Sequence, residues 1–198
     1  PAEHGCLAVL LVGTLTEGPA RPSRWPDEEP RLDAARQMLL LPIVDSYANL
    51  ILKTLFFLRW AAGTGAPHVM VLDDDTYPDV RRLVSLLSRV PAPLARGRFL
   101  MGEVCFGEPV RDASQAAHQN YLSPKCYPLR DLPPWTSGSG FVMSLDLARH
   151  LAANAPTLTR GTFFACGNHS GEDIQIALWL LALGVAPTHS SSFRQFPA

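Results

Sequence analysis

Apolar residues recur along the first part of the chain in two different spacings. Unbroken apolar runs at 6–13 and 68–72 predict strands that are buried on both faces. Between them, apolar residues three and four positions apart predict an amphipathic helix that begins after Asp45 and Ser46 and ends at Gly63. The order strand, helix, strand indicates an α/β fold rather than a helical bundle.

The same pattern extends to the rest of the chain, where proline-rich loops separate shorter elements. Segments 18–30 and 108–134 are polar and rich in proline, which predicts irregular surface loops. A helix is also expected over 32–41, where an apolar run stops before Pro42. Further strands are expected over 98–106 and 141–143, and further helices after Pro78, over 146–153, and from 171 to Gly184.

Composition limits the classes of protein to which the chain can belong. Its 198 residues, 47% hydrophobic and 18% charged, suit one folded domain with a well-filled core. The formal net charge is −1 and no cluster of lysine and arginine stands out, which argues against nucleic-acid binding. No apolar run reaches the ~18 residues that a membrane span needs. Membrane attachment is therefore expected only through an anchor outside this sequence.

The four cysteines lie far apart, at positions 6, 105, 126 and 166, and form no CxxC pair. This spacing argues against a zinc site and leaves both disulfides and free thiols open. Asn168 begins an Asn-His-Ser glycosylation sequon. The sequon gives only weak support for a secretory route, because such triplets arise often by chance.

An acidic triplet, Asp73, Asp74 and Asp75, directly follows the second apolar strand. In open α/β sheets, ligands bind beyond the carboxyl ends of the strands. Alternation along an extended segment places Asp73 and Asp75 on one side, where two carboxylates suit Mg²⁺ or Mn²⁺ bound together with a diphosphate. A solvated acidic turn that caps the next helix fits the triplet equally well.

A second acidic pair, Glu172 and Asp173, opens a predicted helix after Gly171. Carboxylates at this position gain ~0.3–1 kcal/mol from the positive helix end, which alone would account for them. The alternative is a general base aimed at an acceptor hydroxyl. The helix end should hold such a carboxylate ionised, so that it accepts a proton only late in a displacement.

Trp135 precedes a glycine-rich segment, 137–140, that we expect to form a flexible turn. Its glycines allow a ligand to approach the backbone closely, and an aromatic residue beside a polar turn can stack on a sugar. A plain turn with Trp135 in the core is the competing interpretation. The segment matches neither a P-loop nor a dinucleotide-binding fingerprint.

Taken together, these segments resemble the β1,3-galactosyltransferases of the animal and plant Golgi, a family with relatives that transfer N-acetylglucosamine. Five segments carry the resemblance, in the family's order and spacing. They are Asp45-Ser-Tyr-Ala-Asn-Leu-Ile-Leu-Lys-Thr-Leu55; Val71-Leu-Asp-Asp-Asp-Thr76; Pro109-Val-Arg111 with Tyr121-Leu-Ser123; Tyr127-Pro128 through Pro133-Pro-Trp-Thr-Ser-Gly-Ser-Gly-Phe-Val-Met-Ser144; and Glu172-Asp173-Ile174.

The resemblance implies a GT-A fold, in which a Rossmann-type three-layer α/β domain is built around a mostly parallel central sheet. It implies that galactose or N-acetylglucosamine is transferred from a UDP-sugar, with inversion, to a glycan hydroxyl in a β1,3 linkage. A divalent metal, Mn²⁺ or Mg²⁺, is the implied cofactor. The implied setting is protein or proteoglycan glycosylation by a Golgi membrane protein with a lumenal catalytic domain.

The resemblance also implies roles for individual residues. Asp173 would be the catalytic base, and Glu172 would orient the acceptor or support the base. The metal ligands would be Asp75, Asp73 and His189. The donor would be held by Lys53, Asp73, Asp74, Gly138, Ser139 and Gly140, and the acceptor side by Trp135 and Tyr127.

The chain departs from the family at its start. Nothing before Cys6 corresponds to the family's first strand or to its arginine-rich, nucleotide-gripping segment. We therefore expect residues 1–198 to be one glycosyltransferase domain without its N-terminal strand and membrane anchor. Thr136 stands where many relatives have cysteine, so one disulfide of the family cannot form. Two competing functions stay open: a metal-dependent phosphate-ester enzyme that uses the triplet, and an inactive glycan-binding domain of the same fold.

Overall fold

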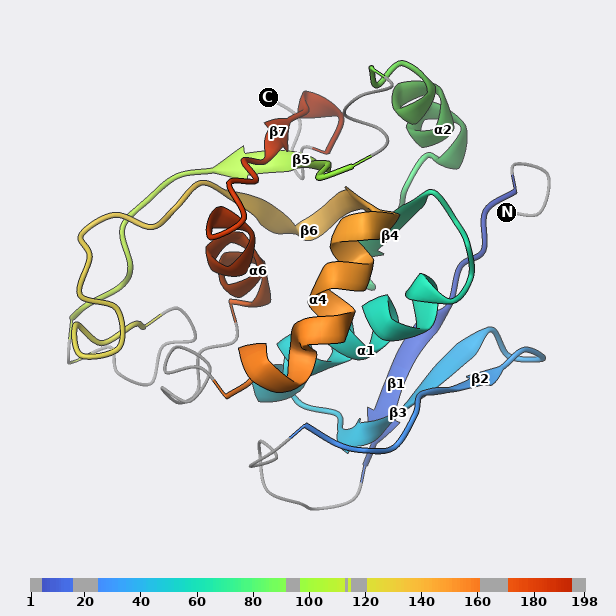
Figure 1. Ribbon diagram of the computed structural model, residues 1–198, viewed down its shortest axis with the longest axis horizontal. Coiled ribbons are helices and arrows are strands. Elements are labelled where there is room, and N and C mark those ends of the chain that lie inside the picture. The colour runs from blue at the N-terminus through green and yellow to red at the C-terminus, as the bar shows by residue number, and fades with distance from the viewer. Residues whose placement is uncertain are drawn as a thin grey trace.

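The computed structural model describes residues 5–15, 25–91, 97–112, 114, 121–160 and 171–193 (Figure 1). The described elements mix strands and helices, which confirms the α/β class. The strands are β1 (Leu10–Thr14), β2 (Arg31–Asp33), β3 (Met38–Val44), β4 (His68–Leu72), β5 (Leu100–Cys105), β6 (Trp135–Ser144) and β7 (Thr188–His189). The helices are α1 (Leu50–Ala62), α2 (Val80–Ser88), α4 (Leu145–Leu158) and α6 (Glu172–Leu181), with 3₁₀ helices at Tyr47–Asn49 and Ser191–Phe193. Among the described helices, none is long and apolar enough to cross a membrane.

The strands form two sheets, with the orders β1-β3-β2 and β4-β6-β5-β7. The pairs β1–β3 and β5–β7 are parallel, whereas β2–β3, β4–β6 and β5–β6 are antiparallel. The expected mostly parallel central sheet is therefore not confirmed by the described strands. The reason is β6, which lies between β4 and β5 and runs opposite to both. In the three-stranded sheet, the tight turn between β2 and β3 likewise permits only an antiparallel pair.

The prediction of a helix over 32–41 is wrong, because this segment forms a β-hairpin. The Asp33 carboxylate holds the turn together: it accepts the Arg36 amide at 3.2 Å and pairs with the Arg36 guanidinium at 2.7 Å. Along β3, every second residue is buried. The apolar run at 38–41 misled the prediction, because the spacing of a short unbroken run does not distinguish a buried strand from a helix.

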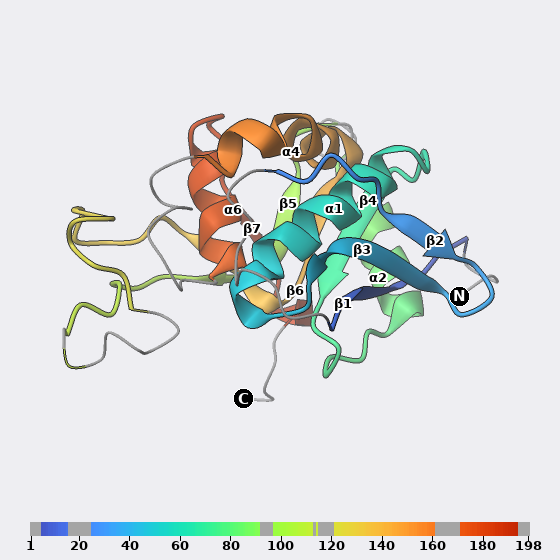
Figure 2. The same ribbon diagram turned by 90° about the horizontal axis from the view of Figure 1, so that it is seen from below.

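Helices cover both faces of the four-stranded sheet (Figures 1 and 2). Phe141 and Met143 of β6 pack in the main core together with residues of α1, α4 and α6. Val142, between them, packs with Phe99 and Met101 in a second cluster that includes residues of α2. Because neighbouring residues of a strand point to opposite faces, β6 lies in the middle of three layers.

The helix predicted after Asp45 is confirmed as a 3₁₀ turn followed by α1. Its buried face includes Ile51, Leu52, Leu55 and Leu58. Each buried leucine contributes about 1.5–3 kcal/mol relative to an exposed one. Asp45 does not cap this helix, since its Oδ1 lies 2.9 Å from Lys53 Nζ and its Oδ2 accepts the Gly13 amide at 3.1 Å. Asp45 therefore ties the end of β1 to α1.

Candidate active site

Two acidic segments that lie far apart in the sequence both lie beside β6. The acidic triplet follows β4, which pairs with β6, and α6 also packs on β6. A Cβ atom added to Gly138 would lie 3.7 Å from Asp173 Oδ2 and 3.7 Å from both carboxylate oxygens of Glu172. The acidic pair therefore lies directly against the backbone of β6.

Burial and mutual repulsion set the charge of these carboxylates. Glu172 is only 5% exposed. Its burial, and then the neighbouring charge of Asp173, raise the pKa of Glu172 to about 8, and Asp73 adds to the shift. Burial, followed by the charges of Asp75 and Asp74, likewise raises the pKa of Asp73. Carboxylates from the triplet and from α6 thus share one site, in which Glu172 carries a proton at neutral pH.

The expectation that the helix end lowers the proton affinity of Asp173 is wrong. Amides do donate to this carboxylate, from Ile174 at 2.8 Å and from Gly138. Burial outweighs these hydrogen bonds and raises the pKa of Asp173, with a further contribution from the charge of Asp73. Asp173 is therefore a stronger base than an exposed aspartate.

The prediction of a glycine-rich turn at 137–140 is also wrong, because these residues belong to β6. Here glycine permits close packing between strands. A Cβ atom on Gly102 of β5 would lie 3.0 Å from Thr136 Cγ2 and 3.2 Å from the Gly140 carbonyl oxygen. The glycines that suggested a turn instead let β6 approach its neighbours, which is the other common use of glycine in a strand.

The acidic triplet suits a metal ion that is shared with a substrate. In the part of the chain that the structure describes, no group of three His, Cys, Asp or Glu side chains could hold a metal by itself. The triplet nevertheless concentrates negative charge, as the raised pKa of Asp73 indicates. Such a donor set fits a divalent cation that takes one or two carboxylates from the protein and its other ligands from phosphate and water.

His189 and Lys53 are both engaged in other contacts. The Val104 amide donates to His189 Nδ1 at 3.1 Å. In this contact the neutral imidazole carries its proton on Nε2, so neither nitrogen offers a lone pair to a metal. Lys53 pairs with Asp45 at 2.9 Å. Neither contact involves the acidic triplet, so a site role for either residue would require these interactions to change.

Tyr127 and Trp135, predicted on the acceptor side, lie beside one small core. Tyr127 is buried with Leu122 and Leu132, and its hydroxyl donates to the Asp131 carbonyl at 2.7 Å. Trp135 is half-buried and packs against the same cluster. Trp135 therefore keeps exposed surface that a sugar could contact, whereas the Tyr127 side chain stabilises the loop that precedes β6.

A cavity of about 460 Å³ adjoins the acidic triplet. Asp75, Ser139 and Gly140 line it, together with α2 and the 3₁₀ helix at 191–193. Tyr77, which is 98% exposed, and Arg82 also belong to its lining. No pattern in the sequence singles out these two residues, because only the packing of α2 beside β6 brings them to the cavity.

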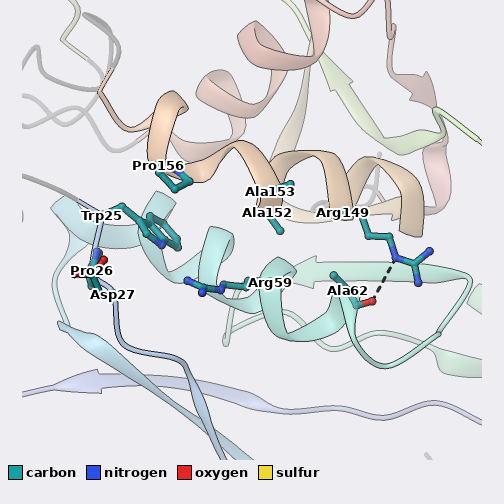
Figure 3. A pocket seen from close by; sticks show the side chains of 9 residues that line it. All are labelled: Trp25, Pro26, Asp27, Arg59, Ala62, Arg149, Ala152, Ala153 and Pro156. Carbon is teal, nitrogen blue, oxygen red and sulfur yellow. Dashed lines mark hydrogen bonds between the residues drawn. The ribbon is translucent and has the colours of Figure 1, made fainter.

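A second cavity, of about 580 Å³, lies between α1, α4 and the segment around Trp25 (Figure 3). Trp25 stacks on Phe56 with ring centroids 4.4 Å apart, and the Arg149 side chain donates to the Ala62 carbonyl at 3.4 Å. None of the predicted site residues lines this cavity. We therefore assign the candidate site to the cavity beside Asp75.

The structure also resolves most of what the cysteine spacing left open. Cys126 is disulfide-bonded, whereas Cys105 is a free thiol. Burial, with the negative charges of Glu103 and Asp173 nearby, raises the pKa of Cys105, so its thiol stays protonated at neutral pH. Cys166 and the predicted sequon at 168–170 lie outside the described residues.

Comparison with known proteins identifies the family. The family model described as Galactosyltransferase matches residues 7–191. Beta-1,3-galactosyltransferase 1 of Homo sapiens is 33% identical over 155 residues, which are 77% of this chain and 44% of that protein. UDP-GlcNAc:betaGal beta-1,3-N-acetylglucosaminyltransferase 7 of Rattus norvegicus is 29% identical over 157 residues, 77% of this chain and 36% of that protein. UDP-GalNAc:beta-1,3-N-acetylgalactosaminyltransferase 2 of Homo sapiens is 27% identical over 148 residues, 74% of this chain and 26% of that protein.

The fold and the site define an α/β domain with a cluster of carboxylates beside its central strand. The chain belongs to the galactosyltransferase family, which confirms the resemblance found in the sequence. It spans less than half the length of the curated relatives named above.

Proposed function

We propose that this protein transfers a hexose, galactose or N-acetylglucosamine, from a UDP-sugar to a glycan hydroxyl in a β1,3 linkage. Membership of the galactosyltransferase family supports the transfer of a sugar as the class of reaction. The names of three relatives support the β1,3 linkage, and two of them name a UDP-sugar. The relatives are named for different sugars, so the choice of sugar stays open.

The observation that carries the proposal is that Glu172 and Asp173 lie against Gly138 and feel the charge of Asp73 from the acidic triplet. A transferase of this kind needs a carboxylate that accepts a proton beside a place for the donor's diphosphate. The acidic pair lies against Gly138, and two residues further along β6 Gly140 lines the cavity beside Asp75. A single strand thus connects the proposed base to the proposed donor site.

Asp173 is the proposed base in an inverting displacement. Its carboxylate takes the proton of the acceptor hydroxyl while the hydroxyl oxygen attacks the anomeric carbon, and the bond from that carbon to UDP breaks. The base works from the face opposite to the leaving group, so the anomeric configuration inverts. Burial raises the pKa of Glu172 to about 8, so its protonated form adds no second negative charge beside Asp173. Glu172 therefore supports the base by staying neutral.

Asp75 and Asp73 are the proposed ligands of a divalent metal, Mn²⁺ or Mg²⁺. Once bound, such an ion supplies positive charge that stabilises the UDP leaving group. Ser139 and the backbone of Gly140 leave room for the donor next to Asp75. Trp135, half-buried at the start of β6, supplies an aromatic surface for the acceptor.

We also propose that residues 1–198 fold as one domain whose two sheets are joined by a further strand, and that the whole protein is a Golgi enzyme with a lumenal domain. Two strand edges support the further strand. Within the described residues, β1 and β4 each pair with a single neighbour, and α1 packs on β1, β3 and β4. Since α1 bridges the two sheets, one added strand between β1 and β4 would join them.

A panel of UDP-sugars tests the proposed function. The full-length protein is incubated with each donor and Mn²⁺, with and without simple β-galactoside and hexosamine acceptors, and UDP release is measured. The proposal requires UDP release that depends on one donor, on an acceptor and on Asp173. Phosphate release without an acceptor would point instead to a phosphate-ester enzyme, and glycan binding without turnover to an inactive glycan-binding domain.

A further inference from the structure

The cavity beside Asp75 has one basic side chain in its lining, that of Arg82. Resting on the proposed function, we propose that Arg82 binds the diphosphate of the donor nucleotide in this cavity. Arg82 lies on α2, about one turn after its N-cap residue Asp79, whose side chain accepts the Arg82 amide at 3.0 Å. The cap fixes the first turn of α2 and with it the position from which the Arg82 side chain extends.

The charge around the cavity calls for a cation. Asp75 and Asp79 both belong to the lining, and Asp73 and Asp74 directly precede Asp75. A diphosphate brings further negative charge, which a single divalent metal bound at the triplet would balance only in part. An additional positive side chain on the cavity wall would reduce the remaining repulsion.

Lys53, which the resemblance implies would hold the donor, is paired with Asp45 at 2.9 Å. Among the described residues, the Arg82 guanidinium has neither an ion pair nor a hydrogen bond. It is therefore free to bind a ligand. A guanidinium also matches phosphate oxygens with two parallel hydrogen bonds, which an ammonium group does not.

The shape of the cavity suits a nucleotide. Its volume of about 460 Å³ falls within the range of about 300–1,000 Å³ that is usual for small-molecule sites. Met70, Leu86 and Phe193 form an apolar wall, while Ser139 and Arg82 supply polar groups. This combination fits a ligand that joins a flat ring system to an anionic group.

Arg81 offers a matched control for Arg82. It is the preceding residue of α2, it is exposed, and it does not line the cavity. Removing either guanidinium changes the net charge equally, so a nonspecific electrostatic effect would appear in both variants. A direct contact would appear only at Arg82.

The test measures UDP and uridine binding by calorimetry in the presence of Mn²⁺, for the wild type, Arg82→Ala, Arg82→Lys and Arg81→Ala. We expect Arg82→Ala to weaken UDP binding about tenfold or more, because a charge-assisted contact is lost, and to leave uridine binding unchanged. Arg82→Lys should recover part of the loss, and Arg81→Ala should bind UDP as the wild type does. Thermal unfolding of each variant shows that the fold is kept.

Equal UDP affinity in the wild type and Arg82→Ala would overturn the inference and leave the proposed function intact. An equal loss in Arg81→Ala and Arg82→Ala would also overturn it, because the effect would then come from overall charge. If the wild type binds no UDP or UDP-sugar, the proposed function itself fails and this inference fails with it.

Discussion

At the scale of single residues, burial governs the chemistry of the site. Glu172, Asp173 and Asp73 all have a raised pKa, and burial is the largest cause for each. The sequence identifies these residues, because acidic groups stand at the end of a strand and at the start of a helix. It does not predict their charge, because amides at a helix start suggest a lowered pKa and only the packing on β6 reveals the opposite.

The raised pKa of Glu172 predicts a pH-dependent stability that glutamine should remove. Glu172 titrates at about 8 in the folded state against 4.5 as a model value for the unfolded state. Between these values the folded protein binds more protons, so the free energy of unfolding falls as the pH rises through this window. Glu172→Gln should match the wild type near pH 5 and be more stable near pH 8, by on the order of a few kcal/mol.

Urea unfolding of both proteins at the two pH values measures this difference. The pKa values of Asp173 and Asp73 are also raised, so the free energy of unfolding of the variant should still fall as the pH rises, by a smaller amount. If the free energy of unfolding falls equally in the two proteins, Glu172 does not hold its proton in the folded state.

Asp75→Ala should remove the part of UDP binding that depends on Mn²⁺, because Asp75 is the proposed metal ligand. Calorimetric titrations with UDP, with and without Mn²⁺, measure this. We expect Mn²⁺ to strengthen binding to the wild type at least about tenfold, which corresponds to about 1.4 kcal/mol, and to have little effect on the variant. If Mn²⁺ strengthens UDP binding equally in the wild type and in Asp75→Ala, the assignment of Asp75 as a metal ligand is wrong.

At the scale of elements, the sequence predicted the helices and strands that have a long apolar pattern or that end at glycine or at a run of acidic residues. The helix ending at Gly63, the strand before Asp73 and the helix after Gly171 were predicted correctly. The segments 32–41 and 137–140 were not, since a short apolar run does not distinguish strand from helix and clustered glycines resemble a turn. Pairing decides both structures: β2 and β3 pair with each other inside the first segment, whereas 137–140 belongs to β6, whose partners β4 and β5 lie elsewhere in the sequence.

The close contact between β5 and β6 gives a prediction at this scale. Gly102→Ala should destabilise the protein by about 1–3 kcal/mol, because its Cβ would press on Thr136 and on the Gly140 carbonyl. Thr136→Ser removes Cγ2. It should therefore lower the free energy of unfolding less in the Gly102→Ala background than in the wild type. Urea unfolding of the single and double variants measures this coupling.

Gly63→Ala serves as the control for Gly102→Ala, because its nearest neighbour would lie at an ordinary 3.5 Å. We expect its free energy of unfolding to stay within about 0.5 kcal/mol of the wild type. If Gly102→Ala is equally harmless, β5 and β6 are not packed as closely as described.

At the scale of the whole molecule, strand order determines which residues meet. β6 pairs with both β4 and β5, and it brings Asp73 near Glu172 and Asp173, about a hundred positions later in the chain. Separate motifs in the sequence could be assigned to one site only through resemblance to a family. The contributions of Tyr77 and Arg82 to the cavity could not be predicted, because they follow from the placement of α2 against β6.

The most direct test of the account compares turnover and donor binding in Asp173→Asn. Asparagine keeps the shape of the side chain but cannot accept the acceptor's proton. The account predicts that UDP-sugar binding stays within about twofold of the wild type, while turnover falls by at least about 10². Turnover close to that of the wild type would contradict the base assignment, and so would a loss of donor binding that accounts for the loss of turnover.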